Sequence, residues 1–230
     1  MDHKKVEKII GVTFKDKALL VQAFTHRSYI NESKNESLSH NERLEFLGDA
    51  VLELVITDFL YNKYPKRTEG DLTAFRAALV NTQTLSQVSS DLGLDAFLLL
   101  SKGEAKDTGR ARSYILANTF EAVTGAIYLD QGYEPAKKFI ADNLFGLMDD
   151  IIKNKTWLDA KSRFQERSQE IVSVTPVYKT IHEEGPDHDK DFVIGVFLKD
   201  EEIARGKGKS KQEAEQMAAR EALEKKGWLD

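Results

Sequence analysis

The sequence contains no cysteine among its 230 residues. This absence excludes disulfide bonds and thiolate metal sites, and it fits a protein of a reducing compartment. Long apolar runs are absent too, and none approaches the roughly 20 residues that a transmembrane helix needs. The charged stretch Met1–Glu7 lacks the apolar core of a signal peptide. We therefore expect a cytoplasmic location and no membrane contact.

An excess of positive charge is also missing. The chain has 33 Lys and Arg against 38 Asp and Glu, a net charge of −5, whereas a basic balance is the usual mark of nucleic-acid binding. A local patch can override this average, and Arg205–Lys211 carries four basic residues and no acid. At a helix N-terminus such a segment attracts phosphate, although basic runs are more often solvated surface.

The apolar residues follow two different periods along the chain. Helical spacing predicts helices in the first two thirds, over residues 6–10, 18–24, 40–64, 68–85, 114–129 and 135–152. The remainder predicts a helix over 160–171, strands over 177–182, 191–198 and 202–206, and a helix over 210–226. We therefore expect a mainly α N-terminal domain (1–152), a linker (153–158) and a small α+β domain of order α-β-β-β-α (159–228).

The helix over residues 40–64 carries an unusual acidic face. Its expected core stripe contains Leu44, Leu47, Val51, Leu54 and Val55. The opposite face carries Glu42, Glu45, Asp49 and Glu53 within a sector of about 80°. Such a stripe is usually just the solvated side of an amphipathic helix. However, the aromatic Phe46 lies inside the acidic sector and no lysine pairs with the acids, which favours a bound cation and a contact with another chain.

A second polar face lies on the helix over residues 114–129. Asn118 and Glu121 are i, i+3 neighbours, and Gly125 continues their face without a side chain. They can be ordinary surface residues, but we hypothesise that this face meets Glu45 and Asp49. Three carboxylates and one amide oxygen would then offer hard ligands for Mg²⁺ or Mn²⁺. Two such cations can activate water and stabilise the leaving oxygen of a phosphodiester.

The segment His40–Ala50, HNERLEFLGDA, resembles the signature of bacterial ribonuclease III. Residues 160–228 resemble the double-stranded-RNA-binding domain that follows it in that family, so the likeness covers essentially the whole chain. The resemblance implies a homodimeric, metal-dependent endoribonuclease that hydrolyses double-stranded RNA in rRNA and mRNA processing. The implied products carry 5′-phosphate and 3′-hydroxyl ends with short 3′ overhangs. The implied cofactor is Mg²⁺, with Mn²⁺ as a substitute.

The resemblance also implies roles for individual residues. The metal ligands would be Glu45, Asp49, Asn118 and Glu121, of which Asp49 and Glu121 would be catalytic. Glu42 and Glu69 would be supporting acids, and Phe46 would plug into the partner subunit at the dimer interface. The implied RNA contacts are Gln165, Glu166, Pro186, His188, Lys207, Lys209, Ser210 and Lys211. Without the resemblance, Gly185–His188 is simply a hairpin turn, and His26 and His40 receive no role.

One position departs from the family pattern, which has Asp where this chain has Asn118. Asn keeps a carbonyl oxygen for a hard cation but loses one negative charge. We therefore hypothesise an active enzyme with weaker metal affinity. The alternative is a catalytically weakened or silent double-stranded-RNA-binding protein. A third possibility, a helical interaction protein with an unrelated C-terminal module, is disfavoured by the joint pattern.

Overall fold

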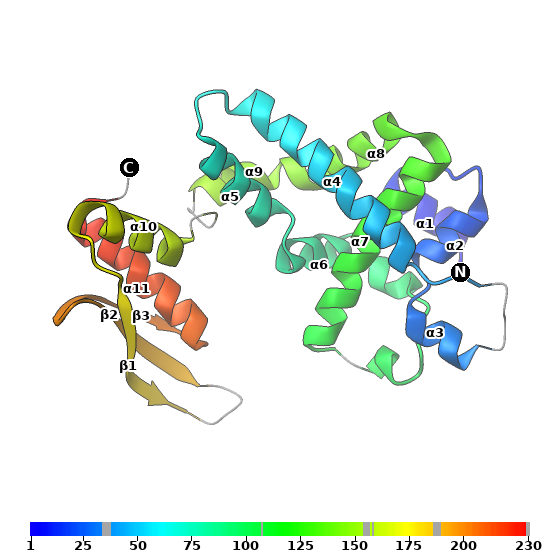
Figure 1. The fold of residues 1–230 in the computed structure, drawn as a ribbon. Coiled ribbons are helices and arrows are strands. Elements are labelled where there is room, and N and C mark those ends of the chain that lie inside the picture. The colour runs from blue at the N-terminus through cyan, green and yellow to red at the C-terminus, as the bar shows by residue number, and fades with distance from the viewer. Residues whose placement is uncertain (34–37, 107, 154–156, 158, 186–189, 229–230) are drawn as a thin grey trace. The chain divides into compact units, whose positions relative to one another are not determined.

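The computed structural model divides the chain into two compact units, Met1–Trp157 and Leu158–Asp230. It describes residues 1–33, 38–106, 108–153, 157, 159–185 and 190–228. The first unit is helical, and the second combines two helices with three strands (Figure 1). The predicted fold class is therefore confirmed. Most of the predicted linker 153–158 lies outside the described residues, so that boundary stays a prediction.

The elements of the first unit are α1 (His3–Ile10), α2 (Lys17–Ala23), α3 (Arg27–Glu32), α4 (Glu42–Lys63), α5 (Glu69–Leu79), α6 (Thr82–Asp91), the short helices η1 (Leu94–Phe97) and η2 (Glu104–Lys106), α7 (Arg110–Gln131), α8 (Tyr133–Ile140), a π-helical turn η3 (Ala141–Phe145) and α9 (Leu147–Lys153). No helix in the described ranges has both the length and the apolar character needed to cross a bilayer.

Two helix predictions for this unit need correction. The helix expected over residues 68–85 is two helices, because Asn81 is extended and its side chain accepts the Thr84 N–H to begin α6. The helix expected over 135–152 divides into α8, η3 and α9. The short helix α3 was not expected at all. In the first case the apolar period continues across the break, so spacing alone does not reveal it.

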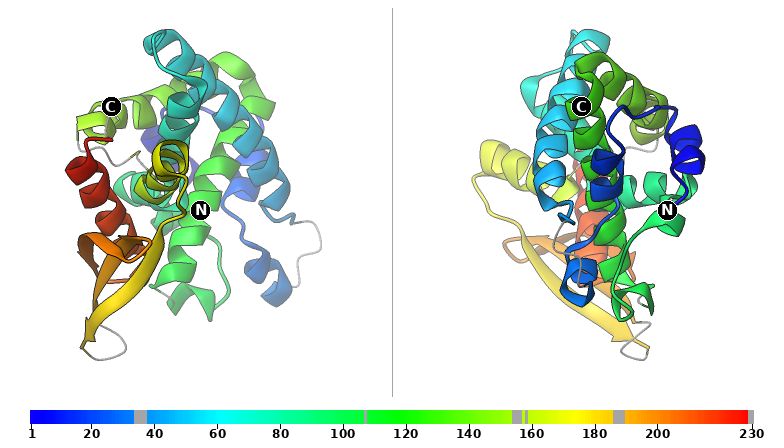
Figure 2. Two further views of the ribbon diagram at one scale, coloured as in Figure 1. Left: turned by 60° about the vertical axis from the view of Figure 1, so that its left-hand side comes forward. Right: turned by 90° about the vertical axis from the view of Figure 1, so that its right-hand side faces the viewer.

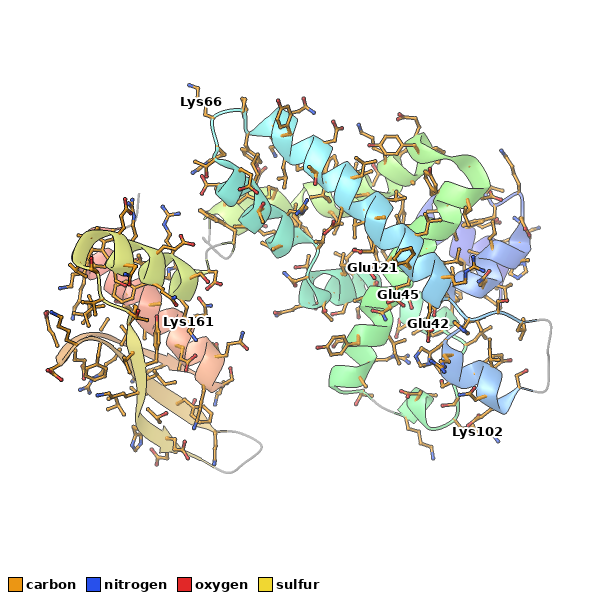
Figure 3. All side chains as sticks on the ribbon, in the orientation of Figure 1. Glu42, Glu45, Lys66, Lys102, Glu121 and Lys161 are labelled. Carbon is orange, nitrogen blue, oxygen red and sulfur yellow. The ribbon has the colours of Figure 1, made fainter. Side chains whose placement is uncertain are left out.

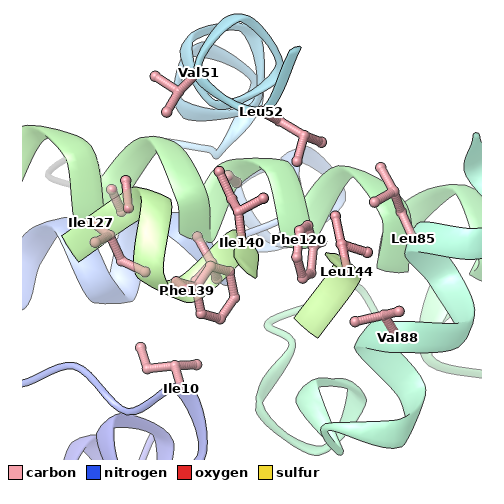
Figure 4. Close-up of a cluster of buried hydrophobic side chains, with 14 of the residues drawn as sticks. Ile10, Val51, Leu52, Leu85, Val88, Phe120, Ile127, Phe139, Ile140 and Leu144 are labelled. Carbon is pink, nitrogen blue, oxygen red and sulfur yellow. The ribbon is translucent and has the colours of Figure 1, made fainter. Parts of the chain in front are cut away.

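The core of the first unit surrounds α4 and α7, which cross each other and pack together at the crossing (Figures 1 and 2). Buried side chains from α4, α7, α8 and η3 interdigitate there, as Figure 4 shows for Leu52, Phe120, Phe139 and Leu144. The stripe expected on α4 is buried at Leu44, Val51 and Val55 but not at Leu54, which is 58% exposed. The core thus fixes the two helices that carry the acidic residues.

The second unit contains α10 (Ala160–Val172), β1 (Val177–Glu184), β2 (Asp191–Leu198), β3 (Glu201–Gly208) and α11 (Lys211–Lys226). Its antiparallel sheet has the order β1-β2-β3. α11 packs on β2 and β3, and α10 packs beside α11. Asp159 caps α10 by accepting the Ser162 N–H, as its position before the helix predicts. β2 has the predicted bounds, whereas β1 and β3 are longer than predicted by one or two residues at an end, which is the usual error of boundary prediction.

Candidate active site and RNA-binding surface

A pair of glycines sets the distance between α4 and α7. A Cβ atom built on Gly48 would lie 1.7 Å from the Glu121 carbonyl oxygen, and one on Gly125 would lie 2.2 Å from the Leu44 carbonyl oxygen. The two backbones therefore touch where the helices cross. Because Gly48 lies between Glu45 and Asp49 in sequence, the crossing carries the α4 acids to the α7 face that bears Glu121.

The acids from the two helices form one electrostatic group (Figure 3). Burial, followed by repulsion from Asp49 and Glu45, raises the pKa of Glu121 from 4.5 to about 7. Burial and the nearby Glu42 raise the pKa of Glu45. Burial and the nearby Glu53 raise the pKa of Asp49. The expected meeting of the two faces is therefore present, and it brings carboxyl groups from both helices close enough to repel one another.

Asn118 joins this group through its side chain. A hydrogen bond from Asn118 lowers the pKa of Glu45 and so opposes part of the repulsion from its acidic neighbours. Glu42 lies at the edge, where its carboxylate is 3.7 Å from Arg27 Nη1 and 3.7 Å from His40 Nδ1. His26 has a structural contact, because its Nδ1 lies 2.8 Å from Ser28 Oγ at the start of α3.

The side chains of this group have the donor atoms that a hard divalent cation binds. The group consists of Glu45, Asp49, Asn118 and Glu121. All four side chains provide oxygen donors, and the negative charges of Glu45 and Asp49 help to raise the pKa of Glu121. Within the ranges that the structure describes, no three Asp, Glu, His or Cys side chains converge tightly enough to form a finished ion cage. The oxygen donors therefore lie near one another at the helix crossing, but they do not surround one position as closely as the ligands of a bound ion do.

Glu69 does not join this group within one chain. It begins α5 and lines a groove at the far half of α4, where the Thr73 hydroxyl donates to its carboxylate at 3.2 Å. Thr57 and Tyr61 line the same groove, and they lie about 18–24 Å along α4 from Glu45 at 1.5 Å per residue. Phe46 is 81% exposed beside the acidic group, so packing within its own chain does not explain its position.

Sequence reasoning missed two residues that hold the site together. Gly48 was missed although a mid-helix glycine costs about 1 kcal/mol and so signals close packing. Asn41 was missed because a polar residue before a helix suggests a cap. Its side chain instead donates to the Ala23 carbonyl at 3.3 Å, and its backbone N–H donates to Thr25 at 2.9 Å. Asn41 is 3% exposed and anchors the start of α4.

The residues that the resemblance implies as RNA contacts lie on several elements of the second unit. Gln165 and Glu166 are exposed on α10. Ser210 caps α11 by accepting the Glu213 N–H at 3.2 Å, and Lys209 and Lys211 flank it. Lys207 follows strand alternation away from α11, because Gly206 and Gly208 face that helix. Pro186 and His188 lie outside the described residues.

Fold and site together define a class of protein: a helical nuclease with a shared acidic site, followed by a module for duplex RNA. Residues 16–148 match the Ribonuclease-III-like family, and residues 160–226 match the double-stranded RNA binding motif. The chain is 45% identical over 225 residues to Ribonuclease 3 of Bdellovibrio bacteriovorus, covering 97% of this chain and 96% of that protein. It is 47% identical over 220 residues to Ribonuclease 3 of Protochlamydia amoebophila, covering 95% and 89%.

A solved structure agrees with these relatives. The nuclease domain of ribonuclease III from Campylobacter jejuni is similar with a TM-score of 0.55 and 42% identity, covering 62% of this chain and 98% of that one. The chain belongs to the ribonuclease III family. It is an endoribonuclease acting on double-stranded RNA, from a family whose enzymes depend on metal ions. The alternative of a silent RNA-binding protein is not favoured, since the matching relatives are named as ribonucleases.

Proposed function

We propose that this endoribonuclease uses Mg²⁺, or Mn²⁺ in its place, held by Glu45, Asp49, Asn118 and Glu121. The observation that carries the proposal is the close crossing of α4 and α7 at Gly48 and Gly125, which brings Glu121 near Glu45 and Asp49. Burial and these two neighbouring carboxylates raise the pKa of Glu121 to about 7. A divalent cation removes that repulsion and favours the ionised forms of the acids. Asn118 contributes an oxygen without a charge, so we expect a weaker affinity for the cation than a fourth carboxylate would give.

The proposed mechanism divides the work between the two helices. Glu45 and Asp49 present oxygens from α4, and Glu121 presents one from α7, so these residues would hold the cation where the helices cross, and the phosphodiester would bind there. When bound, the cation would activate a water and stabilise the charge on the leaving oxygen. Asp49 and Glu121 orient these groups for in-line attack on phosphorus. Loss of the 3′ oxygen then leaves a 5′-phosphate and a 3′-hydroxyl.

A two-fold dimer explains the positions of Phe46 and Glu69. Phe46, Leu54 and Tyr61 form an exposed apolar stripe along α4, with Tyr61 71% exposed. The groove of about 420 Å³ beside this stripe has room for a side chain. If Phe46 of one copy enters the groove of a second, the partner's Glu69 approaches Glu42 and Glu45. The solved Campylobacter jejuni domain is described as forming dimers, which supports this arrangement.

The complete proposal is a homodimer with one acidic site for each strand of a duplex. Two sites related by the two-fold axis would cut opposite strands and leave short 3′ overhangs. The second unit would bind the duplex by shape, with Gln165 and Glu166 at a minor groove and Lys209 and Lys211 on phosphates. Such an enzyme would process rRNA and mRNA precursors, and the cysteine-free composition supports work in the cytoplasm.

Cleavage of a long uniform duplex tests the proposal. We expect 5′-phosphorylated fragments from double-stranded RNA with Mg²⁺ or Mn²⁺, none in EDTA, and none from a DNA duplex of the same sequence. Replacing Glu121 by Gln should lower the cleavage rate at least about 100-fold while RNA binding in EDTA is retained. A matched variant is Glu134→Gln on α8, which should cleave normally. Undiminished cleavage by the Glu121 variant would remove this residue from the mechanism.

A further inference from the structure

The lysines at the start of α11 are occupied by carboxylates of the same unit. Lys209 Nζ lies 3.1 Å from Asp191 Oδ1, at the beginning of β2. Lys211 Nζ lies 3.6 Å from Glu183 Oε2, near the end of β1. These are the two side chains that the proposed function places on RNA phosphates, so the groups meant for phosphate already contact protein anions.

The backbone at the same place is occupied as well. The Lys209 N–H donates to Glu213 Oε2 at 2.7 Å, and Glu213 in turn donates its N–H to Ser210. Glu183 is shared, because Lys190 Nζ lies 3.8 Å from its other oxygen. The N–H groups and lysines at the start of α11 are of the kind that bind phosphate. In this structure they contact carboxylates of the same unit.

These contacts are exchangeable. Both lysines and Asp191 keep more than half of their side-chain surface in water, with Lys209 61% exposed. Exposed ion pairs of this kind change an equilibrium constant by only about two- to five-fold each. A phosphate oxygen can therefore replace the carboxylate, but each replacement weakens binding and leaves an unpaired acid close to the RNA.

We propose that Asp191 and Glu183 are specificity-determining residues, which compete with phosphate for Lys209 and Lys211 and so weaken binding to any polyanion that does not engage both lysines together. Duplex RNA seated by its minor-groove contacts presents phosphates to both lysines at once. A duplex of another shape engages them poorly and leaves the carboxylates in place. The inference rests on the proposed phosphate-binding role of the two lysines.

Binding measurements on the full chain in EDTA, where no cleavage occurs, test this inference. The variant Asp191→Asn/Glu183→Gln should bind duplex RNA about 3- to 10-fold more tightly than the original chain. In the original chain, each carboxylate that phosphate displaces takes up a cation, which reduces the net release of cations on binding. The variant lacks these carboxylates, so the slope of log K against log salt should become steeper by about 1–2. Binding to a DNA duplex of the same sequence should tighten more, so the preference for RNA should fall.

A matched control separates this effect from a general change of charge. Glu202→Gln removes one acid that pairs with Arg205 on β3, 2.7 Å away, and should alter affinity less than either single variant at Asp191 or Glu183. Weaker binding or an unchanged RNA preference in the double variant would overturn the inference. Replacing Lys209 and Lys211 by Ala tests the underlying role, because unchanged RNA affinity there would refute the phosphate contacts themselves.

Discussion

The glycine at position 48 offers the sharpest test of how the acidic site is built. In Gly48→Ala the new Cβ would lie 1.7 Å from the Glu121 carbonyl oxygen, whereas ordinary contact begins at 3.4 Å. The helices must separate by about 1.7 Å, and the residue forced away is Glu121 itself. A misplacement of about 1 Å can cost about 100-fold in rate, so we expect kcat to fall at least 100-fold.

The same substitution should have a moderate effect on stability. Overpacking costs about 1–3 kcal/mol, and the better helix propensity of Ala returns up to about 1 kcal/mol. The assay combines kcat on a duplex RNA, RNA affinity in EDTA and the free energy of unfolding in urea. Gly146→Ala is the matched control, because Gly146, between η3 and α9, has right-handed helical φ and ψ angles and its Cβ would meet nothing within 4 Å. A folded Gly48 variant with kcat within twofold of the original chain would refute the close crossing.

Three further predictions concern charge and assembly. Without a cation, Glu121 holds its proton more tightly in the folded state than in the unfolded state, with a pKa of about 7 against 4.5. Unfolding free energy should therefore drop by about 1–3 kcal/mol from pH 4.5 to above pH 7 in EDTA, but not in Mg²⁺. Asn118→Asp should lower the Mg²⁺ concentration for half-maximal cleavage about 5- to 10-fold. Phe46→Asp should weaken dimerisation at least about 100-fold by sedimentation, whereas Leu129→Asp on α7 should not.

Each of these predictions has a contrary result. If stability in EDTA did not depend on pH, the pKa of Glu121 would not be raised, and the proposed shared cation would lose a main argument. An unchanged Mg²⁺ requirement in Asn118→Asp would mean that this side chain is not a ligand. A dimer that persists in Phe46→Asp at micromolar concentration would place the subunit contact elsewhere on the surface.

Sequence patterns predicted the fold well where periodicity and packing agree. In β2, the alternation of Phe192, Ile194, Val196 and Leu198 predicted the strand, and the last three of these side chains are buried. The break at Asn81 was not predicted, because Leu79 and Leu85 keep apolar residues on both sides of it. Leu54 fits the core stripe of α4 by spacing, yet it lies on the exposed side with Phe46. Such choices depend on neighbours that local periodicity does not contain.

The site shows the same division between local and distant information. The grouping of Glu45 and Asp49 with Glu121 was predicted from an acidic face without lysine partners on one helix and the neighbouring Asn118, Glu121 and Gly125 on the other. The contact of Gly48 with the Glu121 backbone, and the pairing of Lys209 with Asp191, join residues far apart in sequence. No spacing rule reports them, because they depend on how the elements pack.

Calorimetric titration with Mn²⁺ tests the central claim most directly, since it measures whether α4 and α7 share a cation. The original chain should bind Mn²⁺, and Glu45→Gln on α4 and Glu121→Gln on α7 should each weaken that same binding event at least about 10-fold. If either variant bound Mn²⁺ as tightly as the original chain, the two helices would not form a common metal site.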